Sequence, residues 1–350
     1  MKTSKKWLSL LLILALTLTV LAGCGSGDTT GAEDDVASDE TFVWKMQCAY
    51  PPGDMTYDIQ MPMVAEAITE ATDGRITFEL YIPGAICEPA QAPMSVAKGL
   101  LDAAISAPND CAAIVPAAYA EGGIPGYWNN GQDVYDTFYE FGMLEFLQAE
   151  YAKAGLYYGA YVPCGAYNLM TNFPVDDASS LKGKKIRAAS SFATFMEQLG
   201  AAPVIMPGGD IYMGMKLGTI DGNIYTISEL GNAKLKEVTK YIIEPALSGS
   251  APVNMIIGEK SWEAIGPELQ EIVAACLQDT FMEVYEASKA IDDAAVKDAL
   301  AYGTEMYQLS DKGVADFIAA GEEVSKVLSE KYPDAAPGFD IIMKWKASVQ

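Results

Sequence analysis

The sequence of 350 residues contains no histidine. This absence excludes serine–histidine and cysteine–histidine nucleophile pairs, the zinc-binding H-E-x-x-H helix and the imidazole that most often serves as a general base. Basic residues are also scarce, with 23 Lys and Arg against 47 Asp and Glu, which gives a formal net charge of −24. Such a charge repels nucleic-acid phosphates, so we expect no nucleic-acid partner. With 50% hydrophobic and 20% charged residues, the composition is that of a globular protein.

The one long apolar run stands at the N-terminus. A basic start (MKTSKK) is followed by apolar residues 7–21 and by small residues before Cys24, which is the order of a secretory signal. The run is shorter than the about 20 residues that span a bilayer. Residues 21–24 (LAGC) resemble the lipobox of bacterial lipoproteins, which implies a lipoprotein signal peptide over residues 1–23 and lipidation of Cys24. We therefore predict an extracytoplasmic protein anchored to the cell membrane through that lipid. Ordinary secretion with a chance cysteine is the alternative.

Residues 24–40 lack aromatic side chains and are rich in Gly, Ser, Thr and acids. A segment of this composition cannot bury a core, so we predict a flexible acidic tether there and a folded body that begins near Thr41. None of the six cysteines stands in a C-x-x-C pair, which disfavours a structural zinc site. Apart from Cys24 they form an odd set of five, and the sequence leaves any disulfide pairing open.

The body alternates strand and helix patterns in two blocks. The predicted strands cover 42–49, 75–82, 101–107, 156–162, 165–171, 184–188, 202–206 and 220–226. The predicted helices cover 57–71, 93–99, 192–199 and 210–217. This order predicts α/β architecture, with mostly parallel sheets and ligand contacts at the carboxyl ends of strands. Two blocks in one chain suggest two lobes.

Beyond Glu259 the sequence becomes amphipathic, and residues 267 to about 302 contain few helix breakers. A helix of this length exceeds what one lobe needs. Its apolar positions keep no clean heptad, which argues against a coiled coil. We expect one helix that runs across both lobes.

Arginine is rare, since the chain has only Arg75 and Arg187. Arg75 begins a predicted strand after a turn, which is typical of a solvated or ion-paired residue. Arg187 instead ends a predicted strand just before a helix that Ser190 or Ser191 can cap, so a guanidinium and backbone amides converge there. Arginine binds a carboxylate with two hydrogen bonds and stays charged, so this position predicts a carboxylate site. The alternative is a buried ion pair with one of the many acids.

Four motifs stand in a fixed order, and the first of them contains Arg187. They are residues 179–188 (SSLKGKKIRA), 199–204 (LGAAPV), 206–212 (MPGGDIY) and 217–222 (LGTIDG). Together they resemble the signature of solute-binding proteins of tripartite ATP-independent periplasmic (TRAP) transporters, and the resemblance extends more weakly to most of the body. It implies a two-lobed periplasmic-binding-protein-like fold with crossover strands and a long helix spanning both lobes. Lobe I would comprise 41–164 and 253–292, and lobe II 165–252 and 293–350.

The resemblance also implies a function. The chain would be a binding protein, not an enzyme, that closes on a small organic acid, pairs the carboxylate with Arg187 and delivers it to the membrane-embedded subunits of a TRAP-type permease. No cofactor is expected. Two alternatives stay open: a binding lipoprotein of an ABC-type importer, and an exported hydrolase that uses a pair of carboxylates.

Departures from the family pattern at two places narrow the range of ligands that we expect. Tyr167 stands where some members carry a second arginine, which excludes a second arginine clamp. Ile224 and Tyr225 stand where keto-acid or lactate members carry a Glu-Trp pair whose glutamate helps to hold a metal, so we predict no metal and a monocarboxylate ligand. Sialic-acid-type members carry asparagine at the position of Tyr225, which weakens that ligand class; a phenol there could hydrogen-bond the acid or pack on its carbon skeleton.

Further candidates come from strand ends and aromatic positions. Tyr50 and Asn109 follow strands of the first block and should face the cleft, although either could be ordinary surface. Phe192 and Trp128 are candidate aromatic walls, with core packing as the alternative.

Overall fold

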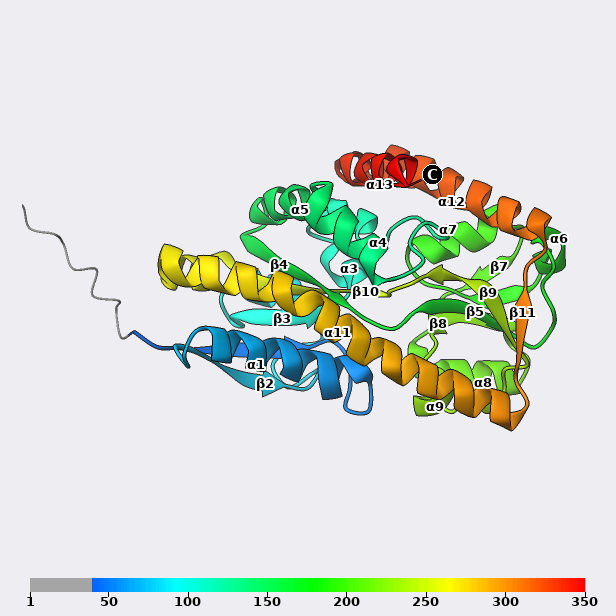
Figure 1. Ribbon diagram of the computed structural model, residues 1–350, viewed down its shortest axis with the longest axis horizontal. Coiled ribbons are helices and arrows are strands. Elements are labelled where there is room, and N and C mark those ends of the chain that lie inside the picture. Colours follow the sequence, from blue (N-terminus) through cyan, green and yellow to red (C-terminus); the bar gives the residue numbers. More distant parts are fainter. Residues whose placement is uncertain (1–39, 350) are drawn as a thin grey trace, which may run out of the picture. The chain divides into compact units, whose positions relative to one another are not determined.

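The computed structural model describes residues 40–349, in which helices and strands alternate around two mixed β-sheets (Figure 1). The predicted signal peptide over 1–23, the predicted lipidation site Cys24 and all but the last residue of the predicted tether lie outside the described residues. Within residues 40–349, no helix combines the length and apolarity needed to cross a bilayer. The five cysteines of the described part are free thiols.

The first sheet has five strands in the order β2-β1-β3-β10-β4. They are β1 (Phe42–Cys48), β2 (Ile76–Tyr81), β3 (Ala103–Ser106), β4 (Leu156–Pro163) and β10 (Pro252–Gly258). Strand β1 pairs in parallel with β2 and β3, whereas β10 runs antiparallel to both β3 and β4. The carboxyl ends of β1 and β3 therefore meet at one edge of this sheet.

The second sheet has six strands in the order β11-β9-β5-β8-β6-β7. They are β5 (Tyr167–Thr171), β6 (Lys185–Arg187), β7 (Ala202–Val204), β8 (Gly222–Thr226), β9 (Tyr241–Ser248) and β11 (Glu305–Gln308). Strand β6 is parallel to β7 and β8, but β5 is antiparallel to β8 and β9. All strands but one in each sheet share one direction, so the prediction of mostly parallel sheets is confirmed. Both sheets are mixed because each receives one inserted antiparallel strand, β10 or β5.

These inserted strands arise at two crossovers. The chain leaves the first sheet at β4 and enters the second at β5 after residues 164–166, and it returns from β9 to β10 through residues 249–251. The two crossovers lie side by side, since the amide of Ala251 donates to the carbonyl of Gly165 at 2.9 Å. The second crossover also passes close to another loop, because a Cβ on Gly249 would lie 2.5 Å from Cα of Asn130. Two lobes joined by crossover strands were expected from the sequence, and the fold agrees.

Helix α11 (Gly266–Tyr302) is 37 residues long and connects the two halves. It packs against α1 (Met61–Ala71) and β4 on the first sheet, and against α9 (Glu229–Asn232) beside the second. Figure 1 shows it in yellow and orange, crossing the molecule past both sheets. The prediction of one helix that runs across both lobes is confirmed. Its buried stripe has bulky apolar residues as far as Tyr285 and small or polar ones after it: Leu269, Val273, Leu277, Phe281, Val284, Tyr285, Ser288, Asp292, Ala295 and Ala299.

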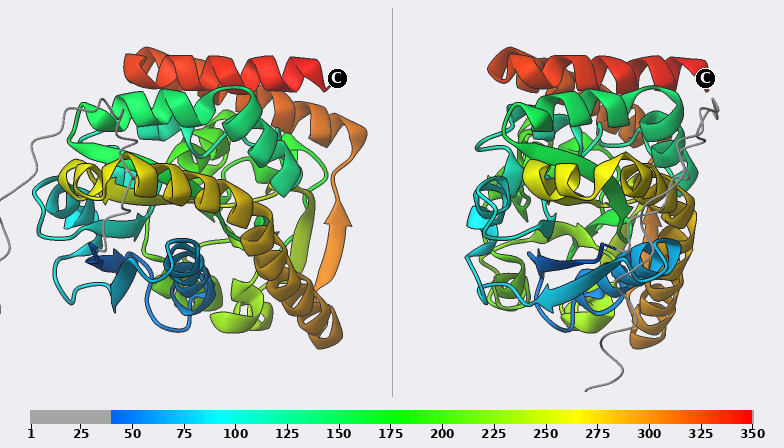
Figure 2. Two further views of the ribbon diagram at one scale, coloured as in Figure 1. Left: turned by 60° about the vertical axis from the view of Figure 1, so that its left-hand side comes forward. Right: turned by 90° about the vertical axis from the view of Figure 1, so that its left-hand side faces the viewer.

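The C-terminal helices contact both halves. Helix α12 (Asp311–Lys331) packs on α7 (Ser191–Gln198), where the rings of Phe195 and Phe317 lie 5.5 Å apart, and α13 (Ala336–Ser348) packs on α5 (Met143–Ala152). Figure 2 shows α12 and α13 along one side of the molecule, in orange and red. The lobe boundaries expected from the sequence, 41–164 with 253–292 and 165–252 with 293–350, stay a prediction.

The remaining helical elements are short. The α-helices are α2 (Ala92–Ala97), α3 (Pro108–Cys111), α4 (Gly131–Tyr135), α6 (Ala178–Leu181), α8 (Ile211–Lys216) and α10 (Glu259–Ala264). The 3₁₀ and π turns are η1 (Thr56–Gln60), η2 (Pro89–Gln91), η3 (Pro116–Ala120), η4 (Asp136–Glu140), η5 (Gly208–Asp210), η6 (Leu235–Glu237) and η7 (Pro333–Ala335). Those between Pro108 and Ala152 have no counterpart among the predicted elements.

Candidate functional site

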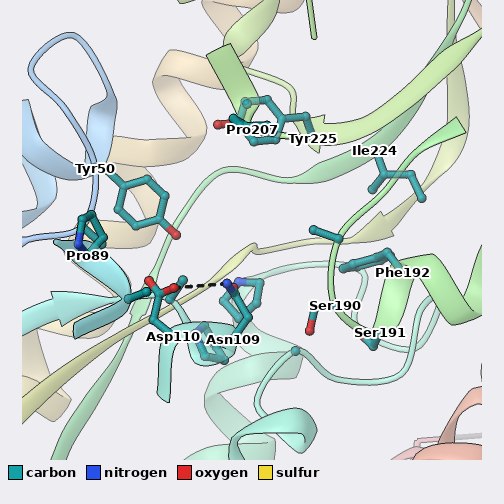
Figure 3. Close-up of a pocket in the computed structure, with 18 of the residues that line it drawn as sticks. Tyr50, Pro89, Asn109, Asp110, Ser190, Ser191, Phe192, Pro207, Ile224 and Tyr225 are labelled. Carbon is teal, nitrogen blue, oxygen red and sulfur yellow. Dashed lines mark hydrogen bonds between the residues drawn. The ribbon is translucent and has the colours of Figure 1, made fainter. Parts of the chain in front are cut away.

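A cavity of about 590 Å³ lies between residues of the two sheets, with a volume in the usual range for small-ligand sites. All six binding residues predicted from the sequence line it: Tyr50, Asn109, Tyr167, Arg187, Phe192 and Tyr225. Figure 3 labels four of them, Tyr50, Asn109, Phe192 and Tyr225, around the cavity. Trp128 does not, because it is buried in the core beside Phe138 and Tyr161. For Trp128, core packing is therefore the correct interpretation.

Strand ends explain why distant residues meet here. Tyr50 follows β1, and Asn109 lies in α3 just after β3, so both project from the first sheet. Arg187 ends β6, and Tyr225 lies near the end of β8, so both project from the second. Parallel strands place their carboxyl ends at one edge of a sheet, and the cavity lies between two such edges.

Arg187 is held in place by backbone carbonyls and not by an acid. Its side chain is 8% exposed, its Nε donates to the carbonyl of Met206 at 3.2 Å, and its Nη1 donates to the carbonyl of Ile224 at 3.0 Å. Within residues 40–349 it takes part in no ion pair, and its Nη2 donates no hydrogen bond to the protein. The alternative of a buried ion pair is therefore not realised among the described residues. The guanidinium is oriented, and its charge stays available to a ligand.

Aromatic rings line the cavity together with the guanidinium. The ring centroid of Tyr225 lies 5.0 Å from Cζ of Arg187, and the rings of Tyr167 and Phe192 lie 5.3 Å apart at 62°. Burial raises the pKa of Tyr167 to about 12, although nearby Arg187 opposes the shift, and burial also raises the pKa of Tyr225 and of Tyr50. These phenols stay protonated at neutral pH, so each can donate a hydrogen bond to a carboxylate.

The start of α7 differs from the prediction of a serine cap. Ser190 occupies the N-cap position with φ 52° and ψ −135°, and neither its side chain nor another caps the helix. The predicted capping by Ser190 or Ser191 is wrong, because the positive φ of Ser190 gives the chain a different approach to the helix and places this residue on the cavity wall. The amides of Phe192 and Ala193 donate to the carbonyls of Ala189 and Ser190, so they are not free for a ligand.

A family model described as bacterial extracellular solute-binding protein, family 7, matches residues 50–331. The chain belongs to this family. The location outside the cytoplasm expected from the sequence agrees with it, and the family is one of solute-binding proteins and not of enzymes. The lipid anchor stays a prediction.

Known relatives of this solute-binding protein support the same assignment. It is 22% identical over 344 residues to the monocarboxylate 2-oxoacid-binding periplasmic protein of Nostoc sp., covering 95% of this chain and 90% of that one. It is 28% identical over 222 residues to the 2,3-diketo-L-gulonate-binding periplasmic protein YiaO of Escherichia coli, covering 61% of this chain and 65% of that one.

Solved structures of TRAP periplasmic solute-binding proteins share its fold. The one from Ochrobactrum anthropi, whose C-terminus is bound in the ligand-binding pocket, has a TM-score of 0.78 at 20% identity and covers 89% of this chain and 97% of that one. The one from Roseobacter denitrificans, with bound β-D-glucuronate, has a TM-score of 0.70 at 21% identity, covering 86% and 98%. The family resemblance and the two-lobed fold predicted from the motifs are confirmed.

Two acids that the sequence analysis did not single out also line the cavity of this solute-binding protein. Asp110 lies in α3 and accepts a hydrogen bond from Nδ2 of Asn109 at 3.3 Å, and Glu88 is exposed at the rim. Burial raises the pKa of Asp110. Among the lining residues, all of which belong to the described part, Arg187 alone is basic. No cluster of three or more Cys, Asp or Glu within residues 40–349 could hold a metal ion.

One carboxyl of the solute-binding protein is buried away from the cavity. Glu121 is fully buried, where Tyr151 of α5 donates its hydroxyl to Oε1 and Asn254 of β10 donates Nδ2 to Oε2 at 2.8 Å. Desolvation raises the pKa of Glu121 to about 7, and the two hydrogen bonds oppose the shift. Glu121 therefore links α5 to the first sheet through hydrogen bonds, although burial of its carboxyl group costs solvation free energy.

Proposed function

We propose that this solute-binding protein captures a small organic acid in the cavity between its two sheets and delivers it to a TRAP-type membrane permease. The observation that carries the proposal is Arg187, which is almost fully buried, is oriented by the carbonyls of Met206 and Ile224, and has no acidic partner among the described residues. A buried cation without a counter-charge favours an anionic ligand.

The relatives support a carboxylate as that anion. The names of the Nostoc and Escherichia coli proteins specify a 2-oxoacid and a diketogulonate, and the Roseobacter structure holds a glucuronate. All three compounds are carboxylic acids. In this chain Arg187 would form two hydrogen bonds to the carboxylate, with the phenols of Tyr167 and Tyr225 beside it and Tyr50, Asn109 and Phe192 around the carbon skeleton.

Capture would be a hinge motion. The predicted lobes, 41–164 with 253–292 and 165–252 with 293–350, would rotate about the paired crossovers at 164–166 and 249–251 until the ligand touches both. We assign no catalysis and no cofactor, because binding and release complete this task. Lipidated Cys24 and the acidic tether would keep the protein at the outer surface of the cell membrane, near its permease.

A thermal-shift and calorimetric screen of the purified protein against monocarboxylates, dicarboxylates, sugars and amino acids tests the proposal. A ligand at 100 times its dissociation constant adds about 2.7 kcal/mol of stability, which is readily measured. We expect carboxylates to stabilise the wild type but not Arg187→Ala.

The other arginine provides the matched control. Arg75 forms an exposed ion pair with Glu268 at 2.8 Å, away from the cavity lining, so Arg75→Ala should bind ligand like the wild type. Stabilisation by sugars alone, or an equal response of Arg187→Ala to carboxylates, would refute the proposed site.

A further inference from the structure

The cavity carries opposite charges on its two sides. Arg187 projects from the second sheet, and Asp110 projects from α3 beside the first. Figure 3 shows Asp110 and Asn109 next to each other on one side of the cavity, with Tyr225 on another. No ion pair joins Arg187 to Asp110, although each lacks any other charged partner within residues 40–349.

Asp110 occupies a position that a ligand can reach. It belongs to the cavity lining, it is only partly buried, and its Oδ1 accepts a hydrogen bond from the Asn109 amide at 3.3 Å. An ionised carboxylate has no hydrogen to donate, so it can only accept hydrogen bonds. A ligand that approaches Asp110 must therefore bring donors of its own.

The charges of the lining limit what the ligand can carry. Arg187 can neutralise one carboxylate of a ligand. The described lining has no second basic side chain that could neutralise a second carboxylate. A second ligand carboxylate would instead lie near Asp110, where like charges repel. Repulsion of the wrong ligand is as effective a source of specificity as attraction of the right one.

We infer that Asp110 is a specificity-determining residue, which selects monocarboxylates that carry hydroxyl or ammonium groups and rejects dicarboxylates. This inference rests on the proposed function, since it takes Arg187 as the site of the first carboxylate. The ligand would connect Arg187 of one side to Asp110 of the other, so its donor groups would also help to hold the closed form.

Matched series of acids test the inference. In each series the carboxylate and chain length are constant and the far end changes: for five carbons, pentanoate, 5-hydroxypentanoate, 5-aminopentanoate and pentanedioate. Corresponding series of three to six carbons, and 2-hydroxy and 2-amino acids of the same lengths, cover other spacings. Dissociation constants are measured by calorimetry for the wild type, Asp110→Asn and Glu88→Gln.

We expect the tightest wild-type series to favour the hydroxyl or ammonium member over the dicarboxylate by about tenfold or more, which corresponds to about 1.4 kcal/mol. In Asp110→Asn, which keeps the shape and an oxygen for the Asn109 amide, this ratio should fall to within about threefold. Glu88→Gln, at the exposed rim, should keep most of the preference. The two donor groups are distinguished because loss of the Asp110 charge weakens ammonium ligands more than hydroxyl ligands.

The contradicting outcomes separate the two claims. If carboxylates bind in an Arg187-dependent way but Asp110→Asn leaves the ratio unchanged, or if dicarboxylates are preferred, the role of Asp110 is refuted and the proposed function stands. If binding does not depend on Arg187, or if no acid of any series binds, both are refuted. Melting temperatures of the variants show whether each is folded.

Discussion

A methyl group on Gly208 should weaken ligand binding while the fold is preserved. A Cβ placed there would overlap the hydroxyl of Tyr225 and lie 2.8 Å from its Cζ, closer than a Cβ approaches another atom. The backbone of Gly208 is not in the left-handed region, so alanine adds no strain of its own. The substitution acts only by displacing the phenol, which packs 5.0 Å from the guanidinium of Arg187.

The magnitude follows from the interactions that this ring makes. Loss of a partly desolvated cation–π contact costs about 0.5 to 2 kcal/mol, and loss of a phenol hydrogen bond to the ligand costs about 0.5 to 1.5 kcal/mol. Together they predict a loss of about 1 to 3.5 kcal/mol in binding, or roughly five- to 300-fold in the dissociation constant. The melting temperature should fall by at most a few degrees, because Tyr225 is half-buried and its ring can turn into the cavity.

The next residue supplies a matched control. Gly209 has no atom within 4 Å of its Cβ position and no positive φ, so Gly209→Ala makes the same chemical change without touching Tyr225. Calorimetry with the tightest acid of the matched series gives the dissociation constants. Gly208→Ala should add nothing to the loss already caused by Tyr225→Ala. Wild-type affinity in Gly208→Ala, or an equal loss in Gly209→Ala, would show that the Tyr225 ring does not support Arg187.

Two further predictions concern stability. Burial raises the pKa of Glu121 from 4.5 to about 7, so the folded state holds this proton more tightly than the unfolded state and the free energy of unfolding falls as pH rises between these values, by about 3 kcal/mol. Glu121→Gln should lack this part of the decrease when urea unfolding is compared at pH 5 and pH 8, and an unchanged pH dependence would contradict the assignment. A Cβ on Gly249 would overlap the backbone of Asn129 and Asn130. Gly249→Ala should therefore lower the melting temperature by several degrees, equivalent to about 1 to 3 kcal/mol. Gly231→Ala is the control and should leave the melting temperature unchanged, because a Cβ there would lie 3.9 Å from its nearest neighbour. Equal melting temperatures of the two variants would show that the crossover tolerates the side chain.

Some features of this molecule can be predicted from short stretches of its sequence. Arg187 could be found because arginine is rare in the chain and because this one ends a strand. Helix α11 could be found because breakers are missing over its length and its buried residues recur every three or four positions. Both signals lie within one element, so the sequence carries them directly.

Other features depend on which segments pair. Strands β5 and β10 are antiparallel because they pair with strands far along the chain. The residue pattern of one strand does not indicate which strands will lie beside it. The short helices between Pro108 and Ala152 offer too few turns for a clear period. Asp110 is one of 47 acids and carries no motif, so only its place on the cavity wall distinguishes it.

The proposed function depends most on direct hydrogen bonds between Arg187 and the carboxylate of the ligand. A double cycle measures it: the best-binding acid and its primary amide are each titrated against the wild type and Arg187→Ala. We predict that the wild type prefers the acid by about 2 to 4 kcal/mol and that this preference disappears in Arg187→Ala. If the variant still prefers the acid by the same margin, the carboxylate lies elsewhere, and the central claim is wrong.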